Sequence, residues 1–173
     1  MKALLLPLAF LAASASAQVI DLQGHRGARG LLPENTLPSF EKALELGVTT
    51  LELDIAVTKD GVLVIYHDQT LNPDITRDAS GRFLEQRGPA LHALTWEQVR
   101  AYDVGRLKPG SEYARAYPEQ QPVDGTRVPR LSDLFELVRR SGNDKVRFAI
   151  ETKLHPERPE ETPAPEPFAT RLA

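Results

Sequence analysis

The spacing of apolar residues along this chain alternates between the period of a strand and the period of a helix. Apolar and polar residues alternate strictly over residues 49–57, which predicts a strand with one buried face. Apolar residues recur every three or four positions before this strand and again over 131–142, which predicts two helices. A further strand is predicted at 146–153, and strands that alternate with helices favour an α/β fold with a parallel sheet.

Local signals mark the ends of the elements in the first half of the chain. A short strand is predicted over residues 19–24. The helix after it should be capped by Asn35 or Thr36 and end near Gly47, because these residue types favour helix ends. Asp60-Gly61 then predicts a tight hairpin turn that returns the chain beside the strand at 49–57.

The second half of the chain begins with a long segment that lacks a continuous period. Residues from about 70 to 130 are therefore expected to form an insertion, with a capping-box pattern at Thr95-Trp96-Glu97-Gln98. Ser132 is the expected cap of the helix after it. After a segment rich in Pro and Glu, residues 168–173 are typical of the first turn of another helix.

The N-terminus has the pattern of a secretory signal peptide at residues 1–17. Lys2 is followed by a short apolar stretch and by Ala15-Ser16-Ala17, a small-residue cleavage signal. The stretch is shorter than the roughly 20 residues of a membrane span, so no transmembrane segment is expected. We therefore expect export, with a periplasmic or extracellular protein of residues 18–173 after cleavage near Ala17.

Charge and cysteine content exclude several classes of site. The formal net charge is −3, and removal of Lys2 with the signal makes it −4, so the chain lacks the basic surface typical of nucleic-acid binding. The chain has no cysteine, which excludes disulfides and thiolate metal sites. A small-molecule partner is expected instead, and the sequence leaves the oligomeric state open.

Three carboxylates occupy corresponding positions on the predicted strands. Glu52 and Asp54 lie two residues apart on one strand and so share a face, and Glu151 lies similarly on the next. Carboxylates brought together repel one another unless a cation holds them, and oxygen donors favour a hard ion. The sequence therefore predicts a site for one divalent cation, Ca²⁺ or Mg²⁺. Alternatively, each acid is solvated or paired with Arg26 or Lys153.

Two histidines and two cations also lie near the ends of predicted strands. His25 and His67 each end an extended run, and imidazoles of near-neutral pKa can act as general base and general acid. Arg26 and Lys153 are candidates for binding a phosphate group, unless they pair with the carboxylates. Alternatively, each histidine is an ordinary hydrogen-bonded residue without a catalytic role, as most histidines in proteins are.

These motifs, in this order, resemble the glycerophosphodiester phosphodiesterase family. The resemblance implies a TIM-type (β/α)8 barrel, of which this chain supplies about the first three β/α units and an insertion at about 70–130. It also implies His25 and His67 as the acid/base pair, with Arg26 and Lys153 binding phosphate and the three acids binding one ion. The motifs are His25-Arg26-Gly27, Glu34-Asn35-Thr36, Glu52-Leu53-Asp54, His67-Asp68 and Glu151-Thr152-Lys153.

The implied reaction is metal-dependent hydrolysis of a glycerophosphodiester to glycerol 3-phosphate and an alcohol. Two alternatives remain: a phospholipase D-like relative that forms a cyclic phosphate, and a non-catalytic exported binding module. A complete barrel of this type takes about 250 residues. We therefore expect the 173-residue chain to be a truncated form that is poorly soluble and inactive by itself, because a partial barrel leaves a sheet edge unpaired.

Overall fold

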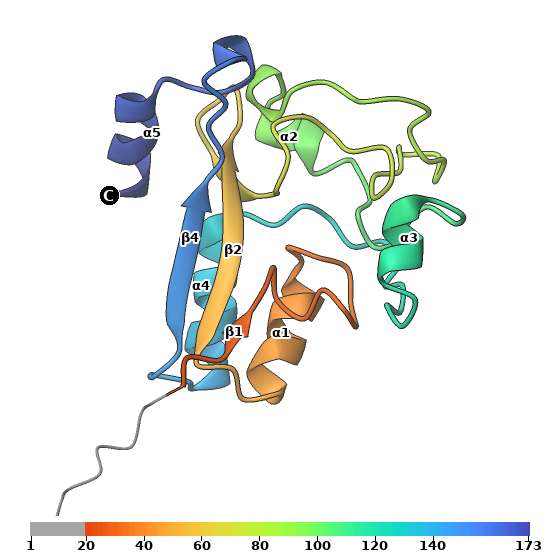
Figure 1. Ribbon diagram of the computed structural model, residues 1–173. Coiled ribbons are helices and arrows are strands. Elements are labelled where there is room, and N and C mark those ends of the chain that lie inside the picture. The colour runs from red at the N-terminus through yellow and green to blue at the C-terminus, as the bar shows by residue number, and fades with distance from the viewer. Residues whose placement is uncertain (1–19) are drawn as a thin grey trace, which may run out of the picture.

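The computed structural model describes residues 20–173, so the predicted signal peptide at 1–17 lies outside the described residues. Four strands and several helices follow one another in the order strand, helix, two strands, insertion, helix, strand and helix (Figure 1). No helix within 20–173 is both long enough and apolar enough to cross a bilayer. The elements are β1 (Gln23–Gly24), α1 (Leu37–Glu45), β2 (Thr50–Val57), β3 (Leu63–Ile65), α2 (Trp96–Val99), α3 (Glu112–Ala116), α4 (Leu131–Ser141), β4 (Arg147–Thr152) and α5 (Pro165–Leu172), with short 3₁₀ helices at Leu91–Ala93 and Pro159–Glu161.

Strand β2 is the centre of the sheet. It pairs in parallel with β1 and with β4, and β3 returns antiparallel to it after the turn at Asp60-Gly61. The α/β class, the parallel strands and the hairpin are thus confirmed. The first strand is shorter than predicted, because only Gln23 and Gly24 pair with β2, while Ile20 and Leu22 are exposed.

One face of β2 forms the main hydrophobic core. Its alternate apolar side chains are all buried, as their spacing predicts, and they pack against helices α1, α4 and α5. In Figure 1, α4 lies behind β2 and β4, and α5 lies beside the end of β4. The opposite face of β2 is thereby left for the polar residues Glu52 and Asp54. The buried residues of β2 on the core side are Leu51, Leu53, Ile55 and Val57.

The insertion between β3 and α4 has a second apolar cluster. Side chains such as Leu71, Leu91 and Val99 pack there against Val64 and Tyr66, which belong to or directly follow β3. The insertion lies at one side of the sheet's carboxyl end, and α5 lies at the other side (Figure 1). The sequence did not predict this cluster, since its members are spread over a segment without a regular period.

Helix ends agree with the sequence prediction at most positions. Thr36 caps α1 through its side chain, and Gly142 ends α4 in the left-handed conformation, with φ of 70°. The predicted capping box at Thr95 and Gln98 is present. Ser132 as the cap of α4 was wrong: the helix begins at Leu131, and the Asp133 side chain accepts from the backbone N–H of Arg130 at 3.0 Å.

Replacing Phe168 of α5 by Ala should lower the free energy of unfolding by about 3–5 kcal/mol. Phe168 is only 1% exposed within the main core, so its loss leaves a cavity there. Phe135→Ala is the matched control, because Phe135 is 43% exposed and should cost less. Urea denaturation of both variants measures the difference, and equal losses would contradict the packing of α5.

Candidate active site

The pairing of β2 with β4 brings the three predicted carboxylates together. Asp54 is the register partner of Glu151, and Glu52 lies two residues earlier on the same face of β2. One oxygen from each of the three carboxylates lies within 4.8 Å of the others. Asp54 is 1% exposed, whereas Glu151 lies at the open side of the group with 60% of its side chain exposed. The predicted convergence of these residues is therefore confirmed.

Arg26 lies beside the carboxylates in a backbone conformation that few residues adopt. Its φ is 53°, in the left-handed region, which costs roughly 1–2 kcal/mol outside glycine. This conformation lets its backbone N–H donate to Glu52 Oε2 at 2.7 Å. The next residue, Gly27, also has positive φ, and an added Cβ would lie 2.6 Å from Ser39 Oγ, so a side chain there would not fit.

The guanidinium of Arg26 is enclosed by two buried acids. Its Nη1 donates to Glu34 Oε1 at 3.0 Å, and its Nε lies 3.2 Å from Asp54 Oδ2. Burial lowers the pKa of Arg26, but the carboxylates of Glu34 and Asp54 outweigh this effect and raise it above its ordinary value. Asn35 completes the group by donating from Nδ2 to Asp54 Oδ2 at 2.9 Å. Glu34 and Asn35 thus contact the site, while Thr36 only caps the helix.

Lys153 bridges two of the three carboxylates. Its ammonium nitrogen lies 2.7 Å from Glu151 Oε1 and 3.0 Å from Asp54 Oδ1. Burial lowers the pKa of Lys153, but the contacts with Glu151 and Asp54 outweigh it and raise the pKa above its ordinary value. The alternative prediction, that the carboxylates form ion pairs with Arg26 and Lys153, is therefore also correct. It is compatible with phosphate binding, since the charge of Lys153 stays at the site.

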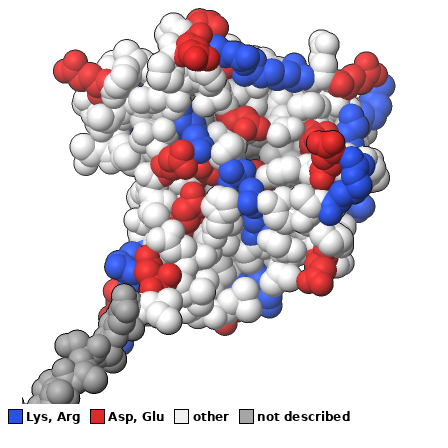
Figure 2. All heavy atoms as spheres, viewed as in Figure 1, with Lys and Arg blue, Asp and Glu red and all other residues white. Residues whose placement is uncertain are grey.

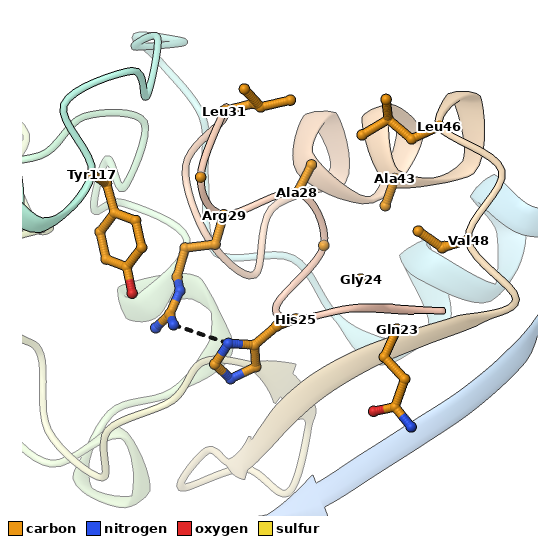
Figure 3. A pocket seen from close by; sticks show the side chains of 12 residues that line it. Gln23, Gly24, His25, Ala28, Arg29, Leu31, Ala43, Leu46, Val48 and Tyr117 are labelled. Carbon is orange, nitrogen blue, oxygen red and sulfur yellow. Dashed lines mark hydrogen bonds between the residues drawn. The ribbon is translucent and has the colours of Figure 1, made fainter. Parts of the chain in front are cut away.

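His25 follows β1, and its ring lies between the carboxylate of Glu52 and the guanidinium of Arg29. Its Nε2 lies 3.8 Å from Glu52 Oε2, and Arg29 Nη2 lies 2.9 Å from its Nδ1 (Figure 3). Because a guanidinium can only donate, Nδ1 of His25 must be the acceptor in this contact. His25 and Arg29 line a cavity of about 330 Å³ that also includes Tyr117, whose ring stacks 4.6 Å from the Arg29 guanidinium carbon.

His67 lies at the same end of the sheet but contacts a different partner. The backbone N–H of Tyr66 donates to Asp54 O at 2.9 Å, so the return strand leads to the carboxylates as predicted. The side chain of His67 bonds through Nδ1 to Asp68 Oδ1 at 2.7 Å, and Asn72 donates to the other oxygen of Asp68. Within residues 20–173, His67 makes no side-chain hydrogen bond to the other six predicted residues.

Asp68 should stabilise the fold in its charged form. Burial raises the pKa of Asp68, but the hydrogen bonds from His67 and Asn72 outweigh burial and lower it below its ordinary value. Its contribution to stability is then full above the unfolded-state pKa and is lost as pH falls through the lower folded-state pKa. Asp68→Asn should therefore be less stable than wild type at about pH 5, and the difference should shrink toward about pH 2. Urea denaturation across this range measures it, and a difference that grows with acidity would contradict the assignment.

The carboxylate group fits a hard divalent cation. All donors are oxygen atoms, which Ca²⁺ and Mg²⁺ prefer. Asp54 Oδ1 is buried beside Lys153 Nζ, 3.0 Å away, and makes no hydrogen bond of regular geometry. The oxygen is therefore paired mainly by charge, and a divalent cation at the site could share it as a ligand. Glu52, Asp54 and Glu151 would hold the ion.

Six of the seven predicted site residues form one connected group, and His67 lies nearby with Asp68. Sequence reasoning missed Arg29 and Tyr113, whose side chains contact each other and reach this group. Arg29 follows the His25-Arg26-Gly27 motif closely, and that proximity was a usable signal. Tyr113 gave no signal, because it is 79 residues from its partner Glu34.

Acidic and basic side chains are interspersed across the face drawn in Figure 2, and this face has no large basic patch.

Comparison with known proteins identifies relatives along most of the chain. A glycerophosphodiester phosphodiesterase from Caldanaerobacter subterraneus subsp. tengcongensis is 37% identical over 114 residues, which are 66% of this chain and 38% of that relative. A crystal structure from Silicibacter pomeroyi, of a candidate glycerophosphoryl diester phosphodiesterase, has a TM-score of 0.83 and 35% identity, and the match covers 91% of this chain and 53% of that one.

A second solved structure is similar in fold and holds a ligand. It is a phosphodiesterase from Oleispira antarctica in complex with the product sn-glycerol-3-phosphate, with a TM-score of 0.56 and 25% identity over 83% of this chain and 48% of that one. The chain thus spans about half or less of the length of these relatives. The family model described as the glycerophosphoryl diester phosphodiesterase family matches residues 25–166. The chain therefore belongs to the glycerophosphoryl diester phosphodiesterase family.

Proposed function

We propose that the protein hydrolyses glycerophosphodiesters to glycerol 3-phosphate and an alcohol. The observation that carries this proposal is the group formed by Glu52, Asp54 and Glu151 beside Arg26 and Lys153. A phosphodiester is an anion that reacts through a more highly charged transition state, so it needs positive charge close to its oxygens. Family membership and the bound product of the Oleispira antarctica relative support the same substrate class.

The chain's own residues would bind the phosphate and transfer protons. Arg26 and Lys153 bind the phosphate oxygens, the former through directed N–H groups and the latter as a point charge. His25 and His67 carry out the proton transfers: one accepts the proton of the attacking hydroxyl of the substrate's glycerol, and the other protonates the oxygen of the departing alcohol. Water then opens the resulting cyclic phosphate to give glycerol 3-phosphate. Asp68 orients His67 by accepting from its Nδ1, and Arg29 orients His25 by donating to its Nδ1.

A divalent cation held by the three carboxylates would supply the remaining positive charge. Ca²⁺ and Mg²⁺ both suit the oxygen donors, and such an ion would polarise a phosphate oxygen and lower the pKa of a bound hydroxyl. We also propose that β1, β2 and β4 are the first three parallel strands of a (β/α)8 barrel. Catalytic residues at the carboxyl ends of strands are the rule in that fold.

Product release by the purified protein tests the function. With Ca²⁺ or Mg²⁺ present, a protein in which these residues are part of a complete (β/α)8 barrel should release glycerol 3-phosphate from glycerophosphocholine, and a chelator should stop the reaction. The 173-residue chain by itself is expected to be inactive, because a partial barrel leaves a sheet edge unpaired. Phosphorus NMR distinguishes the products. A cyclic phosphate as the end product would favour a phospholipase D-like reaction, and binding of the diester without turnover would favour a binding module. Either result would overturn the proposal.

We further propose that the protein is exported, on the basis of the signal-peptide pattern in residues 1–17. Mass spectrometry of the protein from the periplasm or medium of a bacterial host should show a chain that begins near residue 18. A chain of intact mass that remains in the cytosol would contradict export.

A further inference from the structure

The insertion contacts the loop after β1, which carries His25 and Arg26, through helix α3 and the residues that follow it. Tyr113 of α3 donates its hydroxyl proton to Glu34 Oε2, and Glu34 in turn accepts from Arg26 at its other oxygen. The ring of Tyr117 stacks on Arg29, and the side chain of Gln120 donates to Arg29 O at 2.7 Å. A segment far away in the sequence therefore holds the loop that carries His25 and Arg26.

The hydroxyl of Tyr113 uses its full hydrogen-bonding capacity. It donates to Glu34 and accepts from Arg26 Nη1 at 3.3 Å and from Arg29 Nη1 at 3.4 Å. A hydroxyl has one donor and two acceptor positions, so no other group of the chain replaces it without loss. Burial, followed by the neighbouring Glu34 carboxylate, raises the pKa of Tyr113, which keeps the hydroxyl protonated.

This arrangement controls which nitrogen of Arg26 is available. Nη1 donates to Glu34, and Nε is buried 3.2 Å from Asp54 Oδ2 without a regular hydrogen bond, while Nη2 makes no hydrogen bond within residues 20–173. Glu34 is about 5% exposed, so without Tyr113 its Oε2 would lack its closest donor in a place with little water. The other cation near this oxygen is Arg29, whose Nη1 lies 3.7 Å away, too far for a hydrogen bond, so the carboxylate would gain by turning to bind both terminal nitrogens of Arg26. Such a turn would occupy Nη2.

We propose that Tyr113 is a positioning residue that, through Glu34, keeps Nη2 of Arg26 free for the phosphate of the substrate. The proposal rests on the proposed function for the identity of the ligand, but not for the state of Arg26. It makes the insertion a part of the phosphate-binding apparatus, because α3 fixes the guanidinium from outside the sheet. It also predicts that a hydroxyl is needed at this position in addition to an aromatic ring.

The test is Tyr113→Phe in the whole chain, with Tyr102→Phe as the matched control. Tyr102 also lies in the insertion, and its hydroxyl makes no hydrogen bond in the part of the chain that the structure describes. Nitrogen-15 NMR of the arginine side chains should show an ordered Arg26 signal, assigned by its loss in Arg26→Lys. The signal should shift or broaden in Tyr113→Phe and stay unchanged in Tyr102→Phe.

Binding and turnover give the second readout. The affinity for inorganic phosphate by calorimetry should fall about tenfold in Tyr113→Phe, the effect of losing a hydrogen bond to a charged group. In the complete barrel, KM for the diester should rise by a similar factor, with kcat less affected. In a Glu34→Gln background, Tyr113→Phe should add little, because the two residues act in series.

The outcomes separate the two proposals. An unchanged Arg26 signal in Tyr113→Phe, or a lower melting temperature with unchanged Arg26 signal and phosphate affinity, would overturn the positioning role. If the wild-type chain does not bind phosphate and the complete barrel does not turn over the diester, the proposed function fails, and the Arg26 signal still decides whether Tyr113 fixes the guanidinium. Additive effects of Tyr113→Phe and Glu34→Gln would overturn the route through Glu34.

Discussion

Asp54→Asn should lower the affinity for Ca²⁺ or Mg²⁺ by about 100-fold or more, since loss of groups that merely support metal ligands already costs 10–100-fold. Asp54 is the central and most buried of the three carboxylates, and it also contacts Arg26 and Lys153. The amide has the same shape but no charge, so the two cations would lose their shared partner. Breaking such a buried pair costs about 3–5 kcal/mol of unfolding free energy.

Calorimetric titration with each ion measures the first effect, and urea denaturation without ions measures the second. Asp144→Asn is the control, because Asp144 is exposed on the turn after α4 and should change stability by less than about 0.5 kcal/mol. Added cation should also raise the melting temperature of wild type but not of Asp54→Asn. Equal cation affinity in Asp54→Asn and wild type would refute the metal site.

Replacing either His25 or His67 by Ala should lower kcat by about 10²–10⁴, the usual contribution of a general acid or base. The two imidazoles are oriented by different partners, Arg29 for His25 and Asp68 for His67, so neither can take over the other's proton transfer. Steady-state release of glycerol 3-phosphate at saturating substrate, measured in the complete barrel, gives the loss. Near wild-type turnover in both variants would show that the proton carriers are other groups.

His92→Ala is the control for this pair. His92 lies in the 3₁₀ helix Leu91–Ala93 of the insertion and makes no side-chain hydrogen bond in the part of the chain that the structure describes, so kcat should stay near that of wild type. Cation affinity should be measured in His25→Ala as well, because His25 lies 3.8 Å from Glu52. A variant that loses turnover but keeps its cation has lost proton transfer rather than the metal site.

Local patterns predicted the elements that position the site. Strict alternation in β2 identified its two faces, and the hairpin signal identified the return toward Asp54. Such features depend on residues close together in the sequence, where the period of the backbone links spacing to orientation. The convergence of Glu151 with Asp54 followed from one further rule, that successive parallel strands end at the same edge.

Contacts that depend on the geometry of individual side chains could not be predicted in this way. Nothing in the spacing around Tyr113 indicates Glu34 as its partner, because the insertion folds through irregular turns and scattered apolar contacts. The cap of α4 was missed for a related reason: the general preference for Ser yielded to the pairing of Arg130 with Asp133. Both depend on side-chain geometry that a one-dimensional pattern does not contain.

The pairing of β2 with β4 has a consequence for how such a chain can change over evolutionary time. Glu151 faces Asp54 only because Phe148 and Ile150 of the same strand pack on the core side. A substitution of similar volume in that core leaves the register intact, so the sequence there is free to drift. Insertion or deletion of a single residue within β4 would reverse both faces at once and remove ligand and core together. A change of length in this strand should therefore do more damage than a change of similar volume in its core residues.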